Sequence, residues 1–280
     1  MMTLFDVALA GNTEQFRDTY GTATFYGQVM LFNESVRSGP AARRRIIEVG
    51  PDVVVPSKMT VTEVSTNQVF VLAEGSTDWY KGVPIAVKHP AIPIDTTYSL
   101  RTVEQVLAGT IVSELMYAMP SYIRRVIIED TSDYLGGYEM VYSPYYMPVT
   151  VGKIFYGSDG RWFRCRENSR KDDLGLGVSE VVELNSPLQT LAYKALTYNP
   201  VTDTFSEAVS VNVQAFIVPL YLNYTHEVLG SPKIEDGDVA LTVLKSAITT
   251  LNTNEKVGTY LVISVESSGN TWVAHARRNH

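Results

Sequence analysis

The clearest pattern in the sequence is a strict alternation of apolar and polar side chains over residues 209–217. Because neighbouring side chains of a β-strand point to opposite faces, this alternation predicts a long strand with one buried face. The residues expected on that face are Val209, Val211, Val213, Ala215 and Ile217. Pro219 follows. Since proline has no amide hydrogen to donate to a sheet, it predicts an edge, a bend or a bulge at that point.

Shorter apolar runs separated by polar turns fill much of the remaining chain. This spacing is typical of an antiparallel barrel or sandwich rather than of alternating strands and helices. Hairpins are indicated around residues 136–137, 157–160 and 267–270, where glycine and polar residues gather. The predicted strands cover residues 22–32, 45–49, 59–64, 69–73, 83–87, 123–128, 138–142, 153–156, 161–166, 239–244, 260–265 and 271–278.

Helical spacing occurs in two places. Apolar positions within residues 4–9 fit one face of a helix, and Asn12, three residues before Gln15, is placed to cap a turn that runs through Phe16. Residues 100–119 are ambiguous. Their apolar positions fit a helix, whereas Gly109 and several β-branched residues favour a long strand. The sequence leaves the type of this segment open.

The length and the pattern together define a fold class. At 280 residues the chain is long enough for two compact units, which we expect at residues 1–147 and 148–280. The expected class is mainly β, with two small antiparallel β-barrel or β-sandwich modules and a short N-terminal helix. With 45% hydrophobic and 19% charged residues, the composition gives no reason to expect extensive disorder.

Charge and aromatic content limit the partners. The formal net charge is −7 and the pI is near 5.2. The molecule as a whole therefore repels polyanions, which argues against binding of nucleic acid through the electrostatic field of its net charge. Tyrosine is frequent, with 17 residues against 3 tryptophans and 9 phenylalanines. Tyrosine suits half-buried strands and interfaces, because its ring packs while its hydroxyl stays hydrated.

Cys165 is the only cysteine, which excludes an intrachain disulfide and a thiolate-clustered zinc site and favours a reducing compartment. In the hairpin around residues 157–160, Cys165 shares a face with Phe163, so we predict a small core residue rather than a nucleophile. The first ten residues lack a basic region followed by an apolar core, and no window reaches about 18 apolar residues. We therefore expect neither a signal peptide nor a membrane span.

Residues with catalytic or metal-binding chemistry form no recognisable motif. The four histidines have no metal-site spacing, and each is expected at the surface or an interface: His89, His226, His275 and His280. Residues 235–238 are acidic but lack the ligand series of a calcium loop, so a turn before a strand is the simpler interpretation. We predict no catalytic, cofactor-binding or metal-binding residues and no enzyme activity. A site assembled from dispersed residues stays open.

Two further clusters have alternative interpretations. The basic run at residues 43–45 has the charge to contact phosphate, but a solvated loop or a carboxylate-facing interface is favoured in an acidic chain. A tyrosine cluster is expected to pack in the connection between the modules. A sugar-binding platform is the alternative, although no nearby set of carboxamides supports it. The cluster consists of Tyr134, Tyr138, Tyr142, Tyr145 and Tyr146.

Three short segments carry a resemblance to a known class of proteins. Residues 234–238 read IEDGD and enter a strand, residues 272–278 read WVAHARR, and residues 78–85 read DWYKGVPI. The first two resemble the small β-barrel head-tail joining and head-closure proteins of tailed bacteriophages. The third is similar to the same kind of connector component. Those proteins are typically single small domains, whereas this chain is expected to contain two.

The resemblance implies a structural protein of the virion, located at the head-tail junction and assembled in the cytoplasm of the bacterial host. It implies a six- or twelve-fold ring that contacts the portal or an adaptor protein on one side and tail proteins on the other. Packaged double-stranded DNA would pass through the lumen without specific binding, and no membrane or cofactor would be involved. A baseplate, tail or fibre-attachment component is the alternative within the virion, and a carbohydrate-binding β module is the alternative outside this class.

Overall fold

The computed structural model describes residues 13–31, 45–56, 58–94, 96–110, 115–124, 138–144, 147–172, 175–220 and 237–278. Within these residues the regular elements are β-strands, apart from helix α2 (Val103–Leu107). The strand pairings are antiparallel. The predicted class, mainly β with small antiparallel barrels, is confirmed.

The first barrel is built from the N-terminal strands. A seven-stranded sheet in the order β3-β2-β1-β4-β5-β7-β6 closes on itself because β3 also pairs with β7. Its core is aromatic, and the Phe16 ring stacks on Phe25 with 5.5 Å between centroids. The strands are β1 (Glu14–Asp18), β2 (Thr24–Leu31), β3 (Arg45–Val49), β4 (Thr60–Glu63), β5 (Val69–Leu72), β6 (Ser76–Tyr80) and β7 (Val83–Ile94).

The second barrel repeats this arrangement of strands. The order is β10-β9-β8-β11-β12-β14-β13, and pairing of β10 with β14 closes the sheet. At its centre Tyr98 meets the rings of Phe155 and Phe163 edge-on, at 6.1 Å and 5.8 Å. The strands are β8 (Thr96–Arg101), β9 (Leu115–Arg124), β10 (Tyr138–Ser143), β11 (Ile154–Gly157), β12 (Trp162–Cys165), β13 (Arg170–Lys171) and β14 (Gly177–Leu184).

The segment whose type the sequence left open contains both types of structure. Helix α2 begins after Thr102, whose hydroxyl accepts a hydrogen bond from the Gln105 amide while the Gln105 side chain accepts one from the Thr102 amide. The helix ends near Gly109, which has a positive φ of 65° that favours glycine. Strand β9 then starts at Leu115. A capping box and a terminating glycine thus confine the helix to five residues.

The third barrel has the strand order β15-β18-β19-β22-β21-β20 and is closed by pairing of β15 with β20. The predicted closing hairpin is confirmed by the pairing of β21 with β22. Beyond the barrel, β16 and β17 form a two-stranded ribbon. The strands are β15 (Leu188–Lys194), β16 (Leu196–Asn199), β17 (Thr204–Glu207), β18 (Val211–Pro219), β19 (Val239–Leu244), β20 (Lys256–Val257), β21 (Tyr260–Ser268) and β22 (Thr271–Arg278).

The expected domain boundary and the expected N-terminal helix can be compared with these strands. The expected boundary between residues 147 and 148 falls between β10 and β11, which are strands of the same closed sheet. In place of two modules, the described residues form three barrels, two within residues 14–184 and a third after them. The expected N-terminal helix lies mostly outside the described residues. Gln15 and Phe16, at its expected end, belong to strand β1, where Phe16 is buried in the barrel.

The long alternating strand is confirmed in part. Val213, Ala215 and Ile217 are buried as predicted, but Val209, which precedes the strand, and Val211, its first residue, are exposed at the end of the barrel. On the opposite face Phe216 and Val218 are also buried, since this face packs on the second barrel. The alternation thus correctly predicted the strand but not which residues at its ends are covered.

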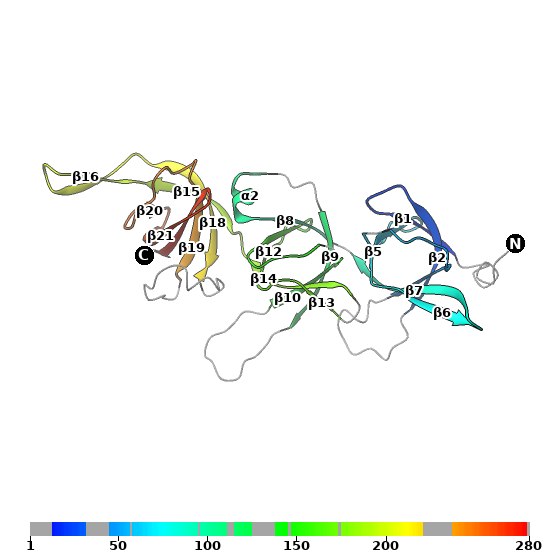
Figure 1. Ribbon diagram of the computed structural model, residues 1–280. Helices are drawn as coiled ribbons and strands as arrows, with labels where there is room; N and C mark the ends of the chain where they lie inside the picture. Colours follow the sequence, from blue (N-terminus) through cyan, green and yellow to red (C-terminus); the bar gives the residue numbers. More distant parts are fainter. Residues whose placement is uncertain are drawn as a thin grey trace, which may run out of the picture.

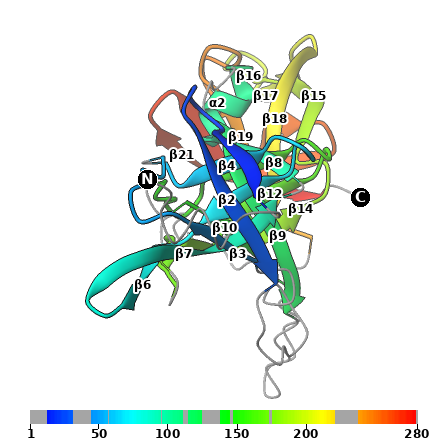
Figure 2. The same cartoon turned by 90° about the vertical axis from the view of Figure 1, so that its right-hand side faces the viewer.

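The barrels lie side by side in a row (Figure 1), which Figure 2 views from the end of the first barrel. An apolar cluster fills each junction. Val71, Ile92 and Ile94 of the first barrel pack with Leu176 of the second. The second junction is larger and joins Val106, Leu107, Ile154 and Leu184 to Phe216 and Val218 of the third barrel. Strands at the junctions are therefore buried on both faces, which holds neighbouring barrels together.

Candidate functional site

In the described part of the chain, two β-ribbons extend beyond their barrels. The first is the β16–β17 ribbon, which continues the β15–β18 pair outward; the Ala208 amide donates to the Ala195 carbonyl at 2.9 Å between the two parts. Glu207 anchors its base and accepts from Lys194 at 2.7 Å and from Lys256 at 3.0 Å. The hydrogen bond from Lys194, followed by that from Lys256, lowers the pKa of Glu207.

The surface of the β16–β17 ribbon is exposed and partly apolar. The Tyr198 and Phe205 rings lie 5.1 Å apart across the pair, and Phe205 is 68% exposed. The Tyr198 hydroxyl donates to Asp203 at 2.8 Å, and this bond raises the pKa of Tyr198. Val201 at the turn is 90% exposed. Exposed apolar groups gathered on one projecting element are typical of an interaction surface.

The second ribbon is formed by β6 and the outer part of β7. Residues 83–86 pair only with β6 among the described residues, because β3 and β5 contact the inner part of β7. Its turn is Lys81-Gly82, both with positive φ, a geometry that matches the twist of a tight hairpin. Asp78 and Lys88 form an ion pair at 2.6 Å. The pKa of Lys88 is raised, mainly by its hydrogen bond to Asp78.

The β6–β7 ribbon also exposes large apolar side chains. Trp79 is 64% exposed, and Tyr80 and Val83 are exposed beside it. The Lys81 ammonium lies 5.3 Å from the centre of the Tyr80 ring, within cation–π range. This ribbon lies on the first barrel and the β16–β17 ribbon on the third, at the two ends of the row (Figure 1). The chain thus carries an exposed aromatic ribbon at each end.

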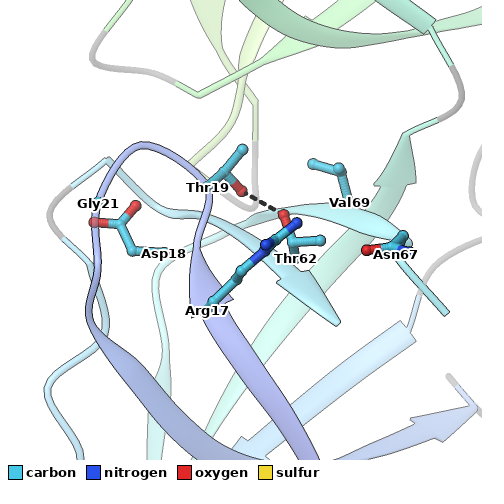
Figure 3. Close-up of a pocket in the computed structure, with 7 residues that line it drawn as sticks. All are labelled: Arg17, Asp18, Thr19, Gly21, Thr62, Asn67 and Val69. Carbon is cyan, nitrogen blue, oxygen red and sulfur yellow. Dashed lines mark hydrogen bonds between the residues drawn. The ribbon is translucent and has the colours of Figure 1, made fainter. Parts of the chain in front are cut away.

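A polar hollow of about 340 Å³ lies beside β1 and β4 of the first barrel. Figure 3 shows the side chains around it, with the Thr19 and Thr62 hydroxyls joined by a 3.0 Å hydrogen bond. Its lining has the donors and acceptors to hold a small polar molecule but no arrangement of nucleophile and base. The lining residues are Arg17, Asp18, Thr19, Gly21, Thr62, Asn67 and Val69.

The two histidines within the described residues are buried, whereas the sequence predicted that each lies at the surface or an interface. His89 is buried in the first barrel, with Nδ1 at 3.1 Å from the Ala73 carbonyl. Burial is the main cause that lowers the pKa of His89. His275 is buried in the third barrel and donates through Nε2 to Asp238 at 2.7 Å. His226 and His280 lie outside the described residues.

Asp238 is the centre of a buried polar cluster that the sequence did not reveal. Its side chain is fully buried and also accepts from Arg277, with Nε at 2.9 Å and Nη2 at 3.0 Å. Of the turn expected at residues 235–238, the described part begins at Gly237, which has a φ of 88°. Each Asp238 oxygen thus has a donor, so the geometry is that of a satisfied structural cluster. The strand register produces the cluster: Val239 of β19 lies opposite Ala276 of β22, so Asp238, one residue before β19, comes next to Arg277.

Cys165 lies where it was predicted, in the core of the second barrel. Burial raises the pKa of its thiol to about 11, and Sγ donates to the Glu167 carbonyl at 2.9 Å. A thiol held in its protonated form is a poor nucleophile. Across the residues that the structure covers, no group of three or more histidine, cysteine or acidic side chains is placed to bind a metal.

The remaining candidates fall largely outside the described residues. Tyr134, Tyr145 and Tyr146 of the tyrosine cluster are among them, as are two of the three arginines of the basic run. Arg45, the third arginine, is in β3. Among the helical residues covered by the structure, none forms a helix of the length and apolarity needed to span a membrane.

Comparisons of the chain with protein-family models, with curated proteins and with solved structures found no match.

Proposed function

We propose that this protein is a structural component of a tailed bacteriophage, a subunit of the ring that joins the head to the tail. The observation that carries the proposal is the pair of exposed aromatic ribbons at the two ends of a packed row of barrels. The closing motif WVAHARR and the segment DWYKGVPI supply the link to head-tail joining proteins. The second of these segments forms the tip of the β6–β7 ribbon.

The packed junctions suit a protein that must keep a fixed shape within a particle. Leu176 at one junction and Phe216 at the other are 1% exposed, so each junction excludes water as a domain core does. Interfaces of this apolar kind resist relative movement of domains, whereas small polar interfaces permit it. A row of barrels held in this way can span a fixed distance between neighbours in a particle.

A ring requires each subunit to offer two complementary surfaces. A head-to-tail contact uses two different patches on each copy, and repeated contacts close into a ring when the rotation permits. The Trp79 ribbon and the Phe205 ribbon are two such patches. The portal or an adaptor protein and the tail proteins would then contact the faces of the assembled ring.

The charge of the chain fits the passage of packaged DNA. With a net charge of −7, a lumen formed by copies of this chain would repel phosphate, so DNA would slide without adhering. The role is that of a duct and a joint, with no chemical step and no cofactor.

Gold-labelled antibodies against this chain, applied to purified particles and imaged by electron microscopy, test the location. Label at the head-tail junction is the expected result, and particles without label there would refute the proposal. Label at the far end of the tail would instead support a baseplate, tail or fibre-attachment component, which needs the same kind of surfaces. Native mass spectrometry of the purified chain gives the number of copies, expected to be six or twelve from the resemblance.

A further inference from the structure

The two ribbons have free strand edges in addition to exposed side chains. Within the described residues β16 and β17 pair only with each other, and β6 pairs only with β7. The amide and carbonyl groups on the outer edges are therefore available to another strand. Such edges accept an added strand readily, and proteins commonly use them for β-augmentation.

Charge indicates which surface each ribbon fits. The β6–β7 ribbon over residues 76–88 carries Lys81 and Lys88 against Asp78, a net charge of +1. The β16–β17 ribbon over residues 196–207 carries Asp203 and Glu207. Glu207 is paired with Lys194 and Lys256 at the base of the ribbon, so Asp203 supplies the unbalanced negative charge of the outer part. Lys81 and Asp203 each lie at the turn of their ribbon. Two copies of one ribbon would bring like charges together, whereas one ribbon of each kind brings opposite charges together.

The aromatic side chains match the same pairing. Trp79 and Tyr80 are exposed on one ribbon, and Tyr198 and Phe205 on the other. Aromatic residues that are buried when two surfaces meet commonly contribute most of the affinity. Because the ribbons project from opposite ends of one molecule (Figure 1), their pairing requires a second copy.

We propose that the β6–β7 ribbon of one copy docks against the β16–β17 ribbon of the next copy, strand edge to strand edge. The contact is head-to-tail, so it adds copies in one direction and closes a ring when the rotation between copies permits. The docking contact deepens the proposed function by naming the surfaces that join neighbouring subunits. Closure into a ring at the head-tail junction rests on that function, but the contact itself does not.

Introduced cysteines test the pairing directly. Thr77 and Thr204 are exposed strand residues of the two ribbons, and neither is one of the aromatic residues. Chains carrying Thr77→Cys and chains carrying Thr204→Cys are treated with a flexible bismaleimide, separately and as an equimolar mixture. The native Cys165 is present in every variant and is buried, so any cross-linking through it is the same background in all samples. The linked peptides are identified by mass spectrometry.

The mixture is expected to give cross-linked dimers at least tenfold more abundantly than either variant alone. The chain carrying both cysteines should give a ladder of covalent oligomers. Equal cross-linking of each single variant with itself would show a symmetric contact and overturn the proposal. Absence of cross-links in a mixture that still assembles by sedimentation velocity would also overturn it, because assembly would then use other surfaces.

Substitution of the exposed aromatics provides an independent measure. Trp79→Asp and Phe205→Asp should each weaken self-association by at least tenfold in sedimentation velocity. Tyr26→Asp is the matched control, because Tyr26 is 60% exposed on β2 of the first barrel, outside both ribbons. Lys81→Glu and Asp203→Lys should each weaken assembly, and mixing the two should restore it. Equal weakening by Tyr26→Asp, or no effect of the ribbon variants, would contradict the docking contact.

The outcomes separate this inference from the proposed function. Gold label at the head-tail junction together with absent cross-links would overturn the docking contact and leave the function standing. Specific cross-links in a protein that labels elsewhere on the particle would do the opposite.

Discussion

Phe216→Ala should weaken the third barrel and its attachment to the second barrel at the same time. Phe216 is 1% exposed and lies in the apolar cluster of the second junction, on the outer face of β18. Its ring meets Trp162 of the second barrel edge-on, at 6.4 Å between centroids. The substitution removes the ring but keeps Cβ, so the strand itself should form normally.

The expected loss follows from the burial of the ring. About 150 Å² of apolar surface at about 25 cal/mol per Å² gives roughly 4 kcal/mol, within the range of about 3 to 5 kcal/mol for large core truncations. The edge-on pair with Trp162 adds about 1 kcal/mol that a simple area count leaves out. Because part of this stabilisation crosses the junction, the variant should unfold in two separated transitions.

Equilibrium urea unfolding, followed by tryptophan fluorescence and by circular dichroism, measures both effects. Phe163→Ala is the matched control, since Phe163 is as buried as Phe216 but lies inside the second barrel. It should lower the stability of that barrel by a similar amount without giving the third barrel independent motion. Small-angle X-ray scattering should show a broader range of molecular dimensions for Phe216→Ala alone. A loss below about 1 kcal/mol, or the same scattering for both variants, would refute the rigid junction.

Three further predictions concern single residues in the first and second barrels. Gly27→Ala should destabilise by about 1 to 3 kcal/mol in urea titrations, because the added Cβ would lie 2.9 Å from the Glu48 carbonyl of the neighbouring strand. Because burial holds the pKa of His89 below 6.5, its contribution is fully present above pH 6.5. The urea midpoint should fall as the pH drops from 6.5 towards the lowered pKa, and the fall should shrink in His89→Gln. Cys165 should react with a thiol reagent at pH 8 at least a hundredfold more slowly in the native protein than in urea, since burial raises its pKa to about 11.

The strands and hairpins could be predicted because their signals are local. Apolar alternation and glycine turns correctly located β11 and β12 around Gly160, and the face shared by Phe163 and Cys165 is buried as expected. The same holds for the closing hairpin of β21 and β22. Each of these signals depends on neighbours within about ten residues, so a single sequence contains them.

The covering of one barrel by another could not be predicted from alternation. Phe216 and Val218 read as part of the polar-facing side of a strand, yet they are buried because α2 and the end of β14 lie over them. Val209 continues the apolar pattern but is exposed, because the barrel ends before it. Alternation states which side chains share a face, but it does not state what lies opposite that face.

The candidate interaction surfaces were partly visible in the sequence. The segment DWYKGVPI was singled out by resemblance, and its tryptophan and tyrosine are exposed on the β6–β7 ribbon. The β16–β17 ribbon was not predicted. Its strands are four residues each and carry few apolar residues, because no barrel core covers them. A strand signal that depends on a buried face is weak where both faces meet water.

The buried cluster around Asp238 shows what register adds to a sequence. Val239 pairs with Ala276, so the next pair outward is Asp238 opposite Arg277, and Ala240 faces His275. A shift of one residue would separate Asp238 from both donors and leave a buried carboxylate unpaired, at a cost of several kcal/mol. The cluster therefore favours a single alignment of β19 with β22, the pair that connects the closing hairpin to the rest of the third barrel. Since β18 pairs with β19 along its other edge, this alignment also fixes the strand that continues into the β16–β17 ribbon. The residues 238, 275 and 277 thus position an exposed surface that none of them touches.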